Sequence, residues 1–321
     1  MNRRFFNPHV KETRRTIFDV ILWKLGHYAD PLPPPIPKDF VYPLPQNILK
    51  SEEPTVTWIN HSTALVKIDG FHLLTDPVWS KRCSPVSFAG PKRRHSPGIE
   101  FSVLPQIDLV LISHDHYDHL DKPTVEALHK RFPKILWLVP AGVKEWFKKR
   151  GIENVIELGW WEETEIDFPQ FKLRATGVPA QHFSGRSAVG INPTLWLGWV
   201  IEFVRQKGEN KRLYFVGDTG YNPYDFKAIG ARWKAVDLSL IPIGSYSPRK
   251  FMKSVHVEPE DAVRIHADVH SKLSIGIHWK TFNLSDEPMQ QPPYDLFCAL
   301  EKQKIDPKTF VALEPGHAIN W

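Results

Sequence analysis

The stretch Ser113-His-Asp-His-Tyr-Asp-His-Leu-Asp121 contains the spacing His-x-His-x-Asp-His, formed by His114, His116, Asp118 and His119. Three imidazoles so close together repel one another when they are protonated and lack hydrogen-bond partners when they are buried and neutral. A divalent cation removes both problems, and nitrogen and oxygen donors suit zinc or a similar borderline metal. The stretch therefore predicts a metal site.

The flanking sequence places this motif on a loop between a strand and a helix. Residues Ile107–Ser113 form an apolar run that is typical of a buried strand, and Lys122–Arg131 have the apolar spacing of a helix. Open α/β sheets bind ligands at the carboxyl ends of their strands. We therefore expect an α/β fold with the site at one edge of a sheet.

The whole chain has the composition of a globular protein. Its 321 residues, 42% of them hydrophobic, suffice for one large α/β domain or two smaller ones. The two cysteines, Cys83 and Cys298, imply no disulfide framework and favour a reducing compartment. The net charge is +5, but lysines and arginines are scattered and accompany no nucleic-acid module, so no nucleic-acid partner is expected. Neither a transmembrane-length run nor a convincing secretory signal occurs, which predicts a cytoplasmic protein, soluble or peripheral at a membrane.

Residues 1–50 differ from the rest of the chain and are expected to form a segment of their own before a globular domain over 51–321. Residues 16–28 have a helical apolar face with basic neighbours, and a proline-rich, extended connector follows them. Such a helix either lies on an anionic membrane or docks on the main domain, and the sequence leaves both open. The apolar face consists of Ile17, Val20, Ile21, Trp23 and Leu25.

From residue 55 onward, apolar periodicity predicts alternating strands and helices. Asp69-Gly70 is expected to form a hairpin turn. The further predicted strands are Thr55–Ile59, Ala64–Ile68, Phe71–Leu74, Ile135–Val139, Leu195–Phe203, Leu213–Val216, Leu238–Ile243 and Leu273–Ile277. The further predicted helices are Val143–Lys149, Pro259–Val269 and Pro293–Lys302.

Three more residues at strand ends or in loops are candidate ligands: His182, Asp218 and His278. Each alone is more often structural, but together with the first cluster they favour two metal sites that share a bridging carboxylate, Asp218. Two ions about 3.5–4 Å apart share a hydroxide of near-neutral pKa and clamp attacking and leaving oxygens, which predicts hydrolysis by a metal-bound hydroxide. The two sites would consist of His114, His116 and His182, and of Asp118, His119 and His278.

Several motifs together resemble the metallo-β-lactamase superfamily, namely Thr75-Asp-Pro77, Ser113–His119, Gly217-Asp-Thr-Gly220 and His278. Over roughly residues 55–315, longer stretches resemble its N-acyl-phosphatidylethanolamine-hydrolysing phospholipase D group. These stretches are Leu74–Pro77, Gly90–Arg93, Asn154–Leu158, Trp160–Glu163, Gly217–Tyr221, Ile241–Gly244, Phe251–Lys253, His256–Val263 and Ile277–Trp279.

The resemblance implies a four-layer αββα sandwich with two zinc ions, manganese being an alternative. The implied reaction is hydrolysis of the phosphodiester of N-acyl-phosphatidylethanolamine, a phospholipid, to N-acylethanolamine and phosphatidic acid. Members of the group are described as membrane-associated homodimers, for which residues 16–28 would provide the contact with lipid.

Five residues are given roles around the metals. By the resemblance, His256 contacts the phosphate or protonates the leaving oxygen; otherwise it caps or supports a helix. Tyr117 either donates a hydrogen bond to a phosphoryl oxygen or packs in the core. Asp118 is expected to be catalytic as well as a ligand. His61 and Asp76 are expected to orient ligands through hydrogen bonds.

Two other functions stay open at this point. One is a lactonase or a hydrolase of phosphorylated metabolites on the same fold, and the other is a non-catalytic lipid- or metal-binding protein. A lipase needs apolar access beside the metals, whereas an enzyme for small metabolites should tolerate loss of residues 1–28.

Overall fold

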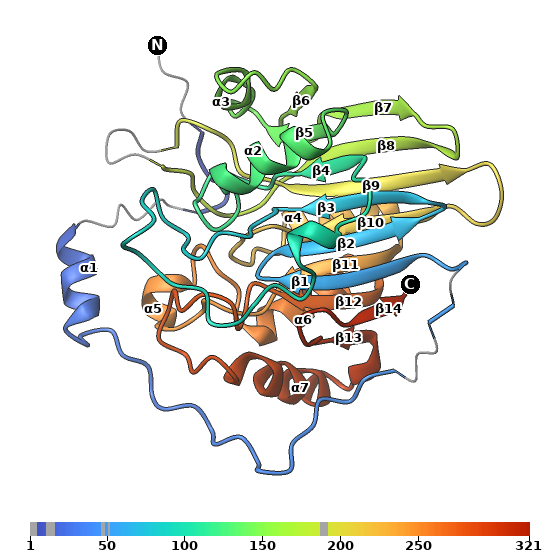
Figure 1. Cartoon of the computed structure of the whole chain (residues 1–321). Coiled ribbons are helices and arrows are strands. Elements are labelled where there is room, and N and C mark those ends of the chain that lie inside the picture. Colours follow the sequence, from blue (N-terminus) through green and yellow to red (C-terminus); the bar gives the residue numbers. More distant parts are fainter. Residues whose placement is uncertain (1–4, 11–16, 46–48, 51, 187–191) are drawn as a thin grey trace.

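The computed structural model describes residues 5–10, 17–45, 49–50, 52–186 and 192–321. Two seven-stranded sheets pack face to face, and helices cover their outer faces (Figure 1). The predicted four-layer αββα sandwich is thereby confirmed.

The first sheet carries the amino-terminal half of the sandwich. Its strands β3, β4 and β5 are parallel, so their carboxyl ends meet at one edge. The predicted hairpin turn joins β2 to β3, with φ of 50° at Asp69 and 80° at Gly70, as a type I′ turn requires. The spatial order is β14 (Ala318–Asn320), β1 (Thr55–Asn60), β2 (Thr63–Ile68), β3 (Phe71–Thr75), β4 (Leu109–Leu111), β5 (Leu136–Pro140) and β6 (Val155–Leu158).

The second sheet carries the carboxyl-terminal half. Its strands β10 to β13 run parallel, with Leu213 opposite Leu238 and Leu240 opposite Ile275. The spatial order is β13 (Phe310–Val311), β12 (Ser271–Ile277), β11 (Val236–Pro242), β10 (Lys211–Phe215), β9 (Gly198–Arg205), β8 (Phe171–Val178) and β7 (Glu163–Asp167).

The helices follow the strands as crossover connections. α2 (Lys122–Arg131) and α3 (Lys144–Lys148) pack on the outer face of the first sheet through Val125, Leu128 and Phe147. The outer face of the second sheet is covered by α4 (Asp225–Trp233), α6 (Pro259–Asp268) and α7 (Gln291–Gln303). Two short helices remain, α1 (Ile17–Lys24) and α5 (Arg249–Met252), together with single 3₁₀ turns at Phe101–Val103 and Pro307–Thr309.

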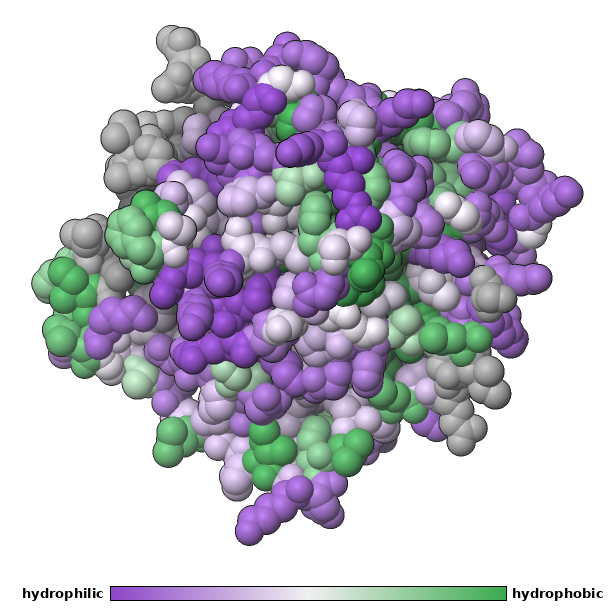
Figure 2. Space-filling view, in the orientation of Figure 1, coloured by the Kyte–Doolittle hydropathy of each residue, from purple (hydrophilic) through white to green (hydrophobic). Residues whose placement is uncertain are grey.

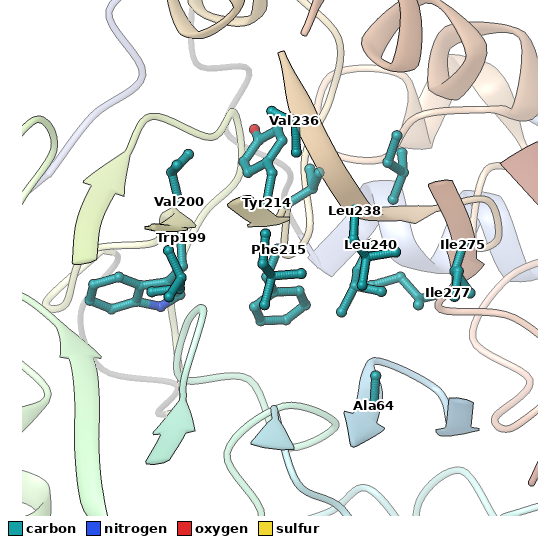
Figure 3. Packing of buried hydrophobic residues seen from close by; sticks show 14 of the residues in the cluster. Ala64, Trp199, Val200, Tyr214, Phe215, Val236, Leu238, Leu240, Ile275 and Ile277 are labelled. Atoms are coloured by element: carbon teal, nitrogen blue, oxygen red, sulfur yellow. The ribbon is translucent and has the colours of Figure 1, made fainter. Parts of the chain in front are cut away.

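The main core lies between the two sheets. Trp199, Phe215 and Leu240 point from the second sheet toward the sheet that carries Ala64, whereas Tyr214 points the other way (Figure 3). This alternation is the period of two that a strand imposes on its side chains. The two halves of the chain therefore hold each other by apolar contact.

Some elements differ from the sequence-based expectation. The strand predicted at Leu195–Phe203 begins only at Gly198, because the preceding residues form the end of a loop. Strands β6, β7, β8, β13 and β14 and helix α4 were not predicted. β7 is a polar edge strand, Glu-Thr-Glu-Ile-Asp, whose side chains are mostly exposed, so it lacks the apolar alternation that marks a strand.

The amino-terminal segment contacts the sandwich along much of its described length. The predicted helix is present as α1, and the chain after it runs beside α7, where Phe40 packs on Tyr294 with ring centroids 5.0 Å apart. The hydroxyl of Tyr42 donates a hydrogen bond to the carbonyl of Phe310. The boundary at residue 50 stays a prediction. No helix among the described residues has the length and apolar character needed to span a bilayer.

A buried histidine far from the motif residues predicts a pH effect on stability. His266 on α6 stacks on Phe310, and its Nδ1 lies 2.8 Å from the Oγ of Ser274. Burial lowers the pKa of His266 from 6.5 to about 4, so only the unfolded chain gains a proton between these values. Its contribution to stability is therefore complete above pH 6.5 and is lost as the pH falls through this window.

When the pH falls from about 7 to about 4.5, the free energy of unfolding of the wild type should decrease by about 2 kcal/mol more than that of His266→Gln, because glutamine does not titrate. Urea denaturation of both proteins at the two pH values measures this difference. Equal losses in the two proteins would contradict the assignment.

Candidate metal centre

The structure brings all seven predicted ligands to one edge of the sandwich, at the carboxyl ends of strands. His114 to His119 follow β4, while His182 follows β8. Asp218 and His278 follow β10 and β12. Because the parallel strands of both sheets end here, residues more than 160 positions apart in sequence become neighbours.

The first predicted group contains three imidazoles. The Nδ1 atom of His116 lies 2.9 Å from the Nε2 of His114 and 3.2 Å from the Nε2 of His182. The other nitrogen of His182 donates to the carbonyl of Val255 at 2.9 Å, and that of His114 lies 2.9 Å from the Oγ of Ser113. These contacts fix the rings so that three nitrogens face one point.

The second predicted group contains a carboxylate and two imidazoles. The Oδ2 atom of Asp118 lies 3.4 Å from the Nε2 of His119 and 3.5 Å from the Nε2 of His278. His278 has a φ of 62°, a backbone conformation that is rare outside glycine and is often found at functional sites.

Asp218 lies between the two groups. Its Oδ2 atom is 3.9 Å from the Nε2 of His114 and 3.7 Å from that of His182 in the first group. The same oxygen is 3.2 Å from the Nε2 of His119 and 3.1 Å from that of His278 in the second. One carboxylate thus faces both groups, as the predicted bridging role requires.

Several donor atoms at this centre are buried without a hydrogen-bond partner. They include the Nε2 atoms of His119 and His278 and the Oδ1 atom of Asp218. Buried polar atoms are normally satisfied, and each unsatisfied one costs about 1–3 kcal/mol. Divalent cations would satisfy these nitrogen and oxygen atoms, so the residues present fit a metal site. The assignment of individual residues as ligands stays a prediction.

The electrostatics of the centre also favour a bound cation. Burial alone would lower the pKa of His278, but the carboxylates of Asp218 and Asp118 raise it to about 9. Asp218 and Asp118 in turn have pKa values well below their usual range, because neighbouring imidazoles outweigh the effect of burial. The carboxylates therefore make this centre favourable for a positive charge.

Asp76 forms a close contact with His119, which fits the orienting role expected for it. Its Oδ2 atom lies 2.6 Å from the Nδ1 of His119, and both of its oxygens accept hydrogen bonds from Ser113. Asp76 is fully buried, and its φ of 29° shows that the backbone is bent to place the carboxylate there. The Nε2 of His119 is thereby directed at Asp118 and Asp218.

His61 lies beside Asp118, one of the predicted ligands, which fits the supporting role expected for it. Its Nε2 is 2.9 Å from the Oδ2 of Asp118, and its ring centroid is 4.0 Å from that of His278. Burial lowers the pKa of His61 to about 3, so the neutral ring donates one hydrogen bond to the carboxylate. Its nitrogen is close enough to belong to the second donor group, which the sequence did not indicate.

Gly217 explains how Asp218 reaches the centre. The residue has a φ of 66°, and a Cβ atom there would lie 2.7 Å from the Cβ of Ser113. Only glycine fits this close approach between the two sheets. The Gly217–Gly220 turn therefore brings the end of β10 into direct contact with the loop Ser113–Asp121, which we call the metal loop.

The two predicted substrate-contacting residues are placed differently. His256 lies beside the donor groups, with its Nδ1 3.8 Å from the Oδ2 of Asp218 and without a hydrogen-bond partner. Tyr117 instead donates its hydroxyl hydrogen to the carbonyl of Arg186 at 2.9 Å, and the Arg186 guanidinium covers its ring. A hydrogen bond from Tyr117 to substrate would require this contact to open.

Two acidic residues tie the loops of the centre together: Asp115, which the sequence analysis missed, and Asp121, which is expected from the sequence to help order the loop of the His-x-His-x-Asp-His motif. Asp115, inside the metal motif, accepts a hydrogen bond from the backbone N–H of Gly185 at 3.0 Å. Asp121 accepts three, from the backbone and hydroxyl of Ser80 and from the hydroxyl of Thr124. Polar residues in a loop carry no pattern that identifies such partners, because the partners lie far away in sequence.

Comparison with known proteins agrees with this geometry. The model of the beta-lactamase superfamily domain matches residues 72–279. The chain is 41% identical over 267 residues to the N-acyl-phosphatidylethanolamine-hydrolyzing phospholipase D 1 of Caenorhabditis elegans, which covers 81% of this chain and 74% of that protein. It is 34% identical over 237 residues to the mitochondrial N-acyl-phosphatidylethanolamine-hydrolyzing phospholipase D of Saccharomyces cerevisiae, covering 74% and 49% of the two chains.

A solved structure supports the fold. A metallo hydrolase of the archaeon Ignicoccus hospitalis aligns with a TM-score of 0.59 at 19% identity, over 84% of this chain and 98% of that one. The chain therefore belongs to the metallo-β-lactamase superfamily and, within it, to the N-acyl-phosphatidylethanolamine-hydrolysing phospholipase D group, and it is a metal-dependent hydrolase.

Proposed function

We propose that this protein holds two zinc ions and hydrolyses the phosphodiester of N-acyl-phosphatidylethanolamine to N-acylethanolamine and phosphatidic acid. The observation that carries the proposal is the position of the Asp218 carboxylate between two groups of buried donors. The relatives named for this reaction support the choice of substrate. Manganese is an alternative metal for the same nitrogen and oxygen donors.

The residues of the centre divide the work between holding cations and contacting substrate. His114, His116 and His182 would hold one ion, Asp118, His119 and His278 the other, and Asp218 both. Bound divalent ions supply positive charge to phosphoryl oxygens and lower the pKa of water.

His256 would contact the phosphate beside these residues. Burial lowers the pKa of His256 to about 3, so the ring is neutral near pH 7. A neutral ring donates a single N–H hydrogen bond to a phosphoryl oxygen, and this favours phosphate contact over proton donation by an imidazolium.

A cavity of about 720 Å³ beside the metal loop supports an anionic substrate. Tyr117 of the metal loop forms part of its wall. The basic residues that line it are Lys81, Arg82, Lys122, Arg150 and Arg186, against the acidic Asp121 and Glu126. The carboxylate of Asp121 accepts hydrogen bonds from Ser80 and Thr124, so the charge that the wall exposes is mainly positive.

Helix α1 provides a candidate contact with lipid. Trp23 docks on Phe251 of α5 with ring centroids 4.9 Å apart, and its Nε1 donates to Asp286. Phe18, Ile21 and Leu25 are 62%, 49% and 69% exposed, and the space-filling view shows an apolar surface where α1 lies (Figure 2). One face of α1 docks on the main domain, and the other face is free to contact an anionic membrane. The arrangement is therefore compatible with both alternatives that the sequence leaves open. The homodimer that the resemblance implies stays a prediction.

The reaction is tested with purified protein of measured metal content. Mixed-chain N-acylated and ordinary phospholipids are offered in vesicles, and the products are read by mass spectrometry. We expect release of N-acylethanolamine and phosphatidic acid that stops on chelation and returns with zinc. A protein that binds metal stoichiometrically but cleaves no phospholipid would disprove the lipase assignment and direct the search to small esters and phosphorylated metabolites.

The role of α1 predicts a selective loss of vesicle binding. The triple variant Phe18→Ser, Ile21→Ser, Leu25→Ser should bind anionic vesicles at least about tenfold more weakly in co-sedimentation, because each exposed side chain contributes about 1.5–3 kcal/mol when fully buried in an apolar phase. Val103→Ser with Val204→Ser, at positions 69% and 37% exposed elsewhere, is the control. Equal binding by the triple variant and the control would exclude α1 as the lipid contact.

A further inference from the structure

The loop that carries His182 has little regular structure to hold it. Between the end of β8 at Val178 and the start of β9 at Gly198, the described residues form neither helix nor strand apart from an isolated bridge between Gln181 and Gly220. The ring of His182 is fixed through Val255, but its backbone needs other partners. The hydrogen-bond partners of the His182 backbone must therefore come from segments outside the two β-sheets.

One side-chain amide from the amino-terminal segment connects both ends of this loop. The Nδ2 of Asn7 donates to the carbonyl of His182 at 2.8 Å. The Oδ1 of Asn7 accepts from the Nε1 of Trp196 at 3.2 Å, and the same indole N–H also donates to Ala180 at 2.9 Å. Trp196 is almost completely buried, so it gives this amide a rigid support.

The residues two positions before and two positions after Asn7 are themselves anchored. The backbone N–H of Phe5 donates to the carbonyl of Asn192, and the Asn192 side chain donates to the carbonyl of Phe5, each at 3.2 Å. On the other side, the ring of His9 stacks on Tyr224 and its Nε2 lies 3.4 Å from Asp225. The amide of Asn7 is therefore held in place from both directions.

We propose that Asn7 is a positioning residue for His182, acting from a segment that lies 175 positions earlier in the chain. The inference rests on the proposed role of His182 as a metal ligand. The carbonyl bonded by Asn7 is attached to the Cα atom of His182, so the hydrogen bond fixes the peptide group next to the atom that carries the imidazole side chain. Loss of a hydrogen-bond partner of a ligating side chain costs about 10–100-fold in metal affinity, and we expect the loss of this backbone partner to lie at the lower end of that range.

The test compares metal affinity in three variants with that of the full-length wild type. Asn7→Leu has similar volume and removes both hydrogen bonds, whereas Asn7→Asp keeps the acceptor for Trp196 and removes the donor to His182. Asn154→Leu is the matched control. The Asn154 side-chain amide likewise bonds to the backbone, at the carbonyls of Lys134 and Ile135, but it lies at the amino ends of β5 and β6, away from the metal centre.

Zinc affinity is measured by competition with a chelator, and the cobalt-substituted proteins are compared by visible absorption. We expect both Asn7 variants to bind one metal equivalent about tenfold more weakly, with a changed cobalt spectrum. Asn154→Leu should match the wild type in affinity and spectrum even where its midpoint of thermal unfolding falls equally.

Two results would overturn the inference, and they differ in what else they exclude. Wild-type affinity and spectrum in Asn7→Leu would remove the positioning role and leave the proposed function intact. A wild type that binds no divalent metal would remove both.

Discussion

Replacing Asp218 by asparagine should remove at least one of the two metal equivalents and lower kcat/KM by roughly 10³-fold or more. The Oδ2 atom of Asp218 lies within 3.9 Å of ring nitrogens from both donor groups. Asparagine has nearly the same shape, but it carries no charge and presents an amide group to nitrogens that need a cation. Metal content by mass spectrometry and steady-state kinetics on the same preparation measure the two effects.

The control for this variant is Asp237→Asn. Asp237 also accepts tertiary hydrogen bonds, from the backbone of Arg212 and from Lys272, but it lies at the amino end of β11, away from the centre. We expect it to keep both metal equivalents and its activity. Full metal content in Asp218→Asn would show that this carboxylate does not bridge the two sites.

The second large effect is expected for His256→Ala, which should lower kcat by about 10²–10³-fold while both metal equivalents remain bound. The neutral ring is proposed to donate one hydrogen bond to the phosphoryl group, and alanine cannot replace it. His256→Gln should recover part of the activity, because an amide N–H also donates. Kinetics and metal content of both variants, with His129→Ala on α2 as the control, provide the measurement.

Metal content is what separates two roles for His256. Its Nδ1 lies close enough to His182 and Asp218 to form a third group of donor atoms. Loss of a metal equivalent together with activity in His256→Ala would make it a ligand and contradict the proposed contact with phosphate.

The amino-terminal segment shows where sequence reasoning reached its limit. Its composition differs from that of the main domain, which suggested that residues 1–28 are dispensable for a small-metabolite enzyme. In the structure, Asn7 bonds to the backbone of His182 and Trp23 docks on α5. Under the positioning role proposed for Asn7, we expect removal of residues 1–28 to disturb the metal centre for any substrate, so this truncation would not distinguish the two enzymes.

The strands that were overlooked have a common physical explanation. In β8 the buried Phe171, Leu173 and Ala175 alternate with the exposed Lys172. The pattern is visible but weak, because five of the eight positions of the strand are small or polar. β13 and β14 have two and three residues, and they are strands only because a neighbouring strand pairs with them. Such short segments have no periodicity of their own.

The sequence by itself determined the chemistry of this protein. The His-x-His-x-Asp-His spacing is local and demands a cation, and the apolar runs around it require strands whose carboxyl ends form the site. Asp218 as a shared carboxylate and His61 as a supporting residue were expected from the sequence. Their partners and distances, and the contact of Asn7 with His182, came only from the tertiary structure. These contacts join residues from different strands and loops, and their distances follow from how two sheets pack, which no local pattern encodes.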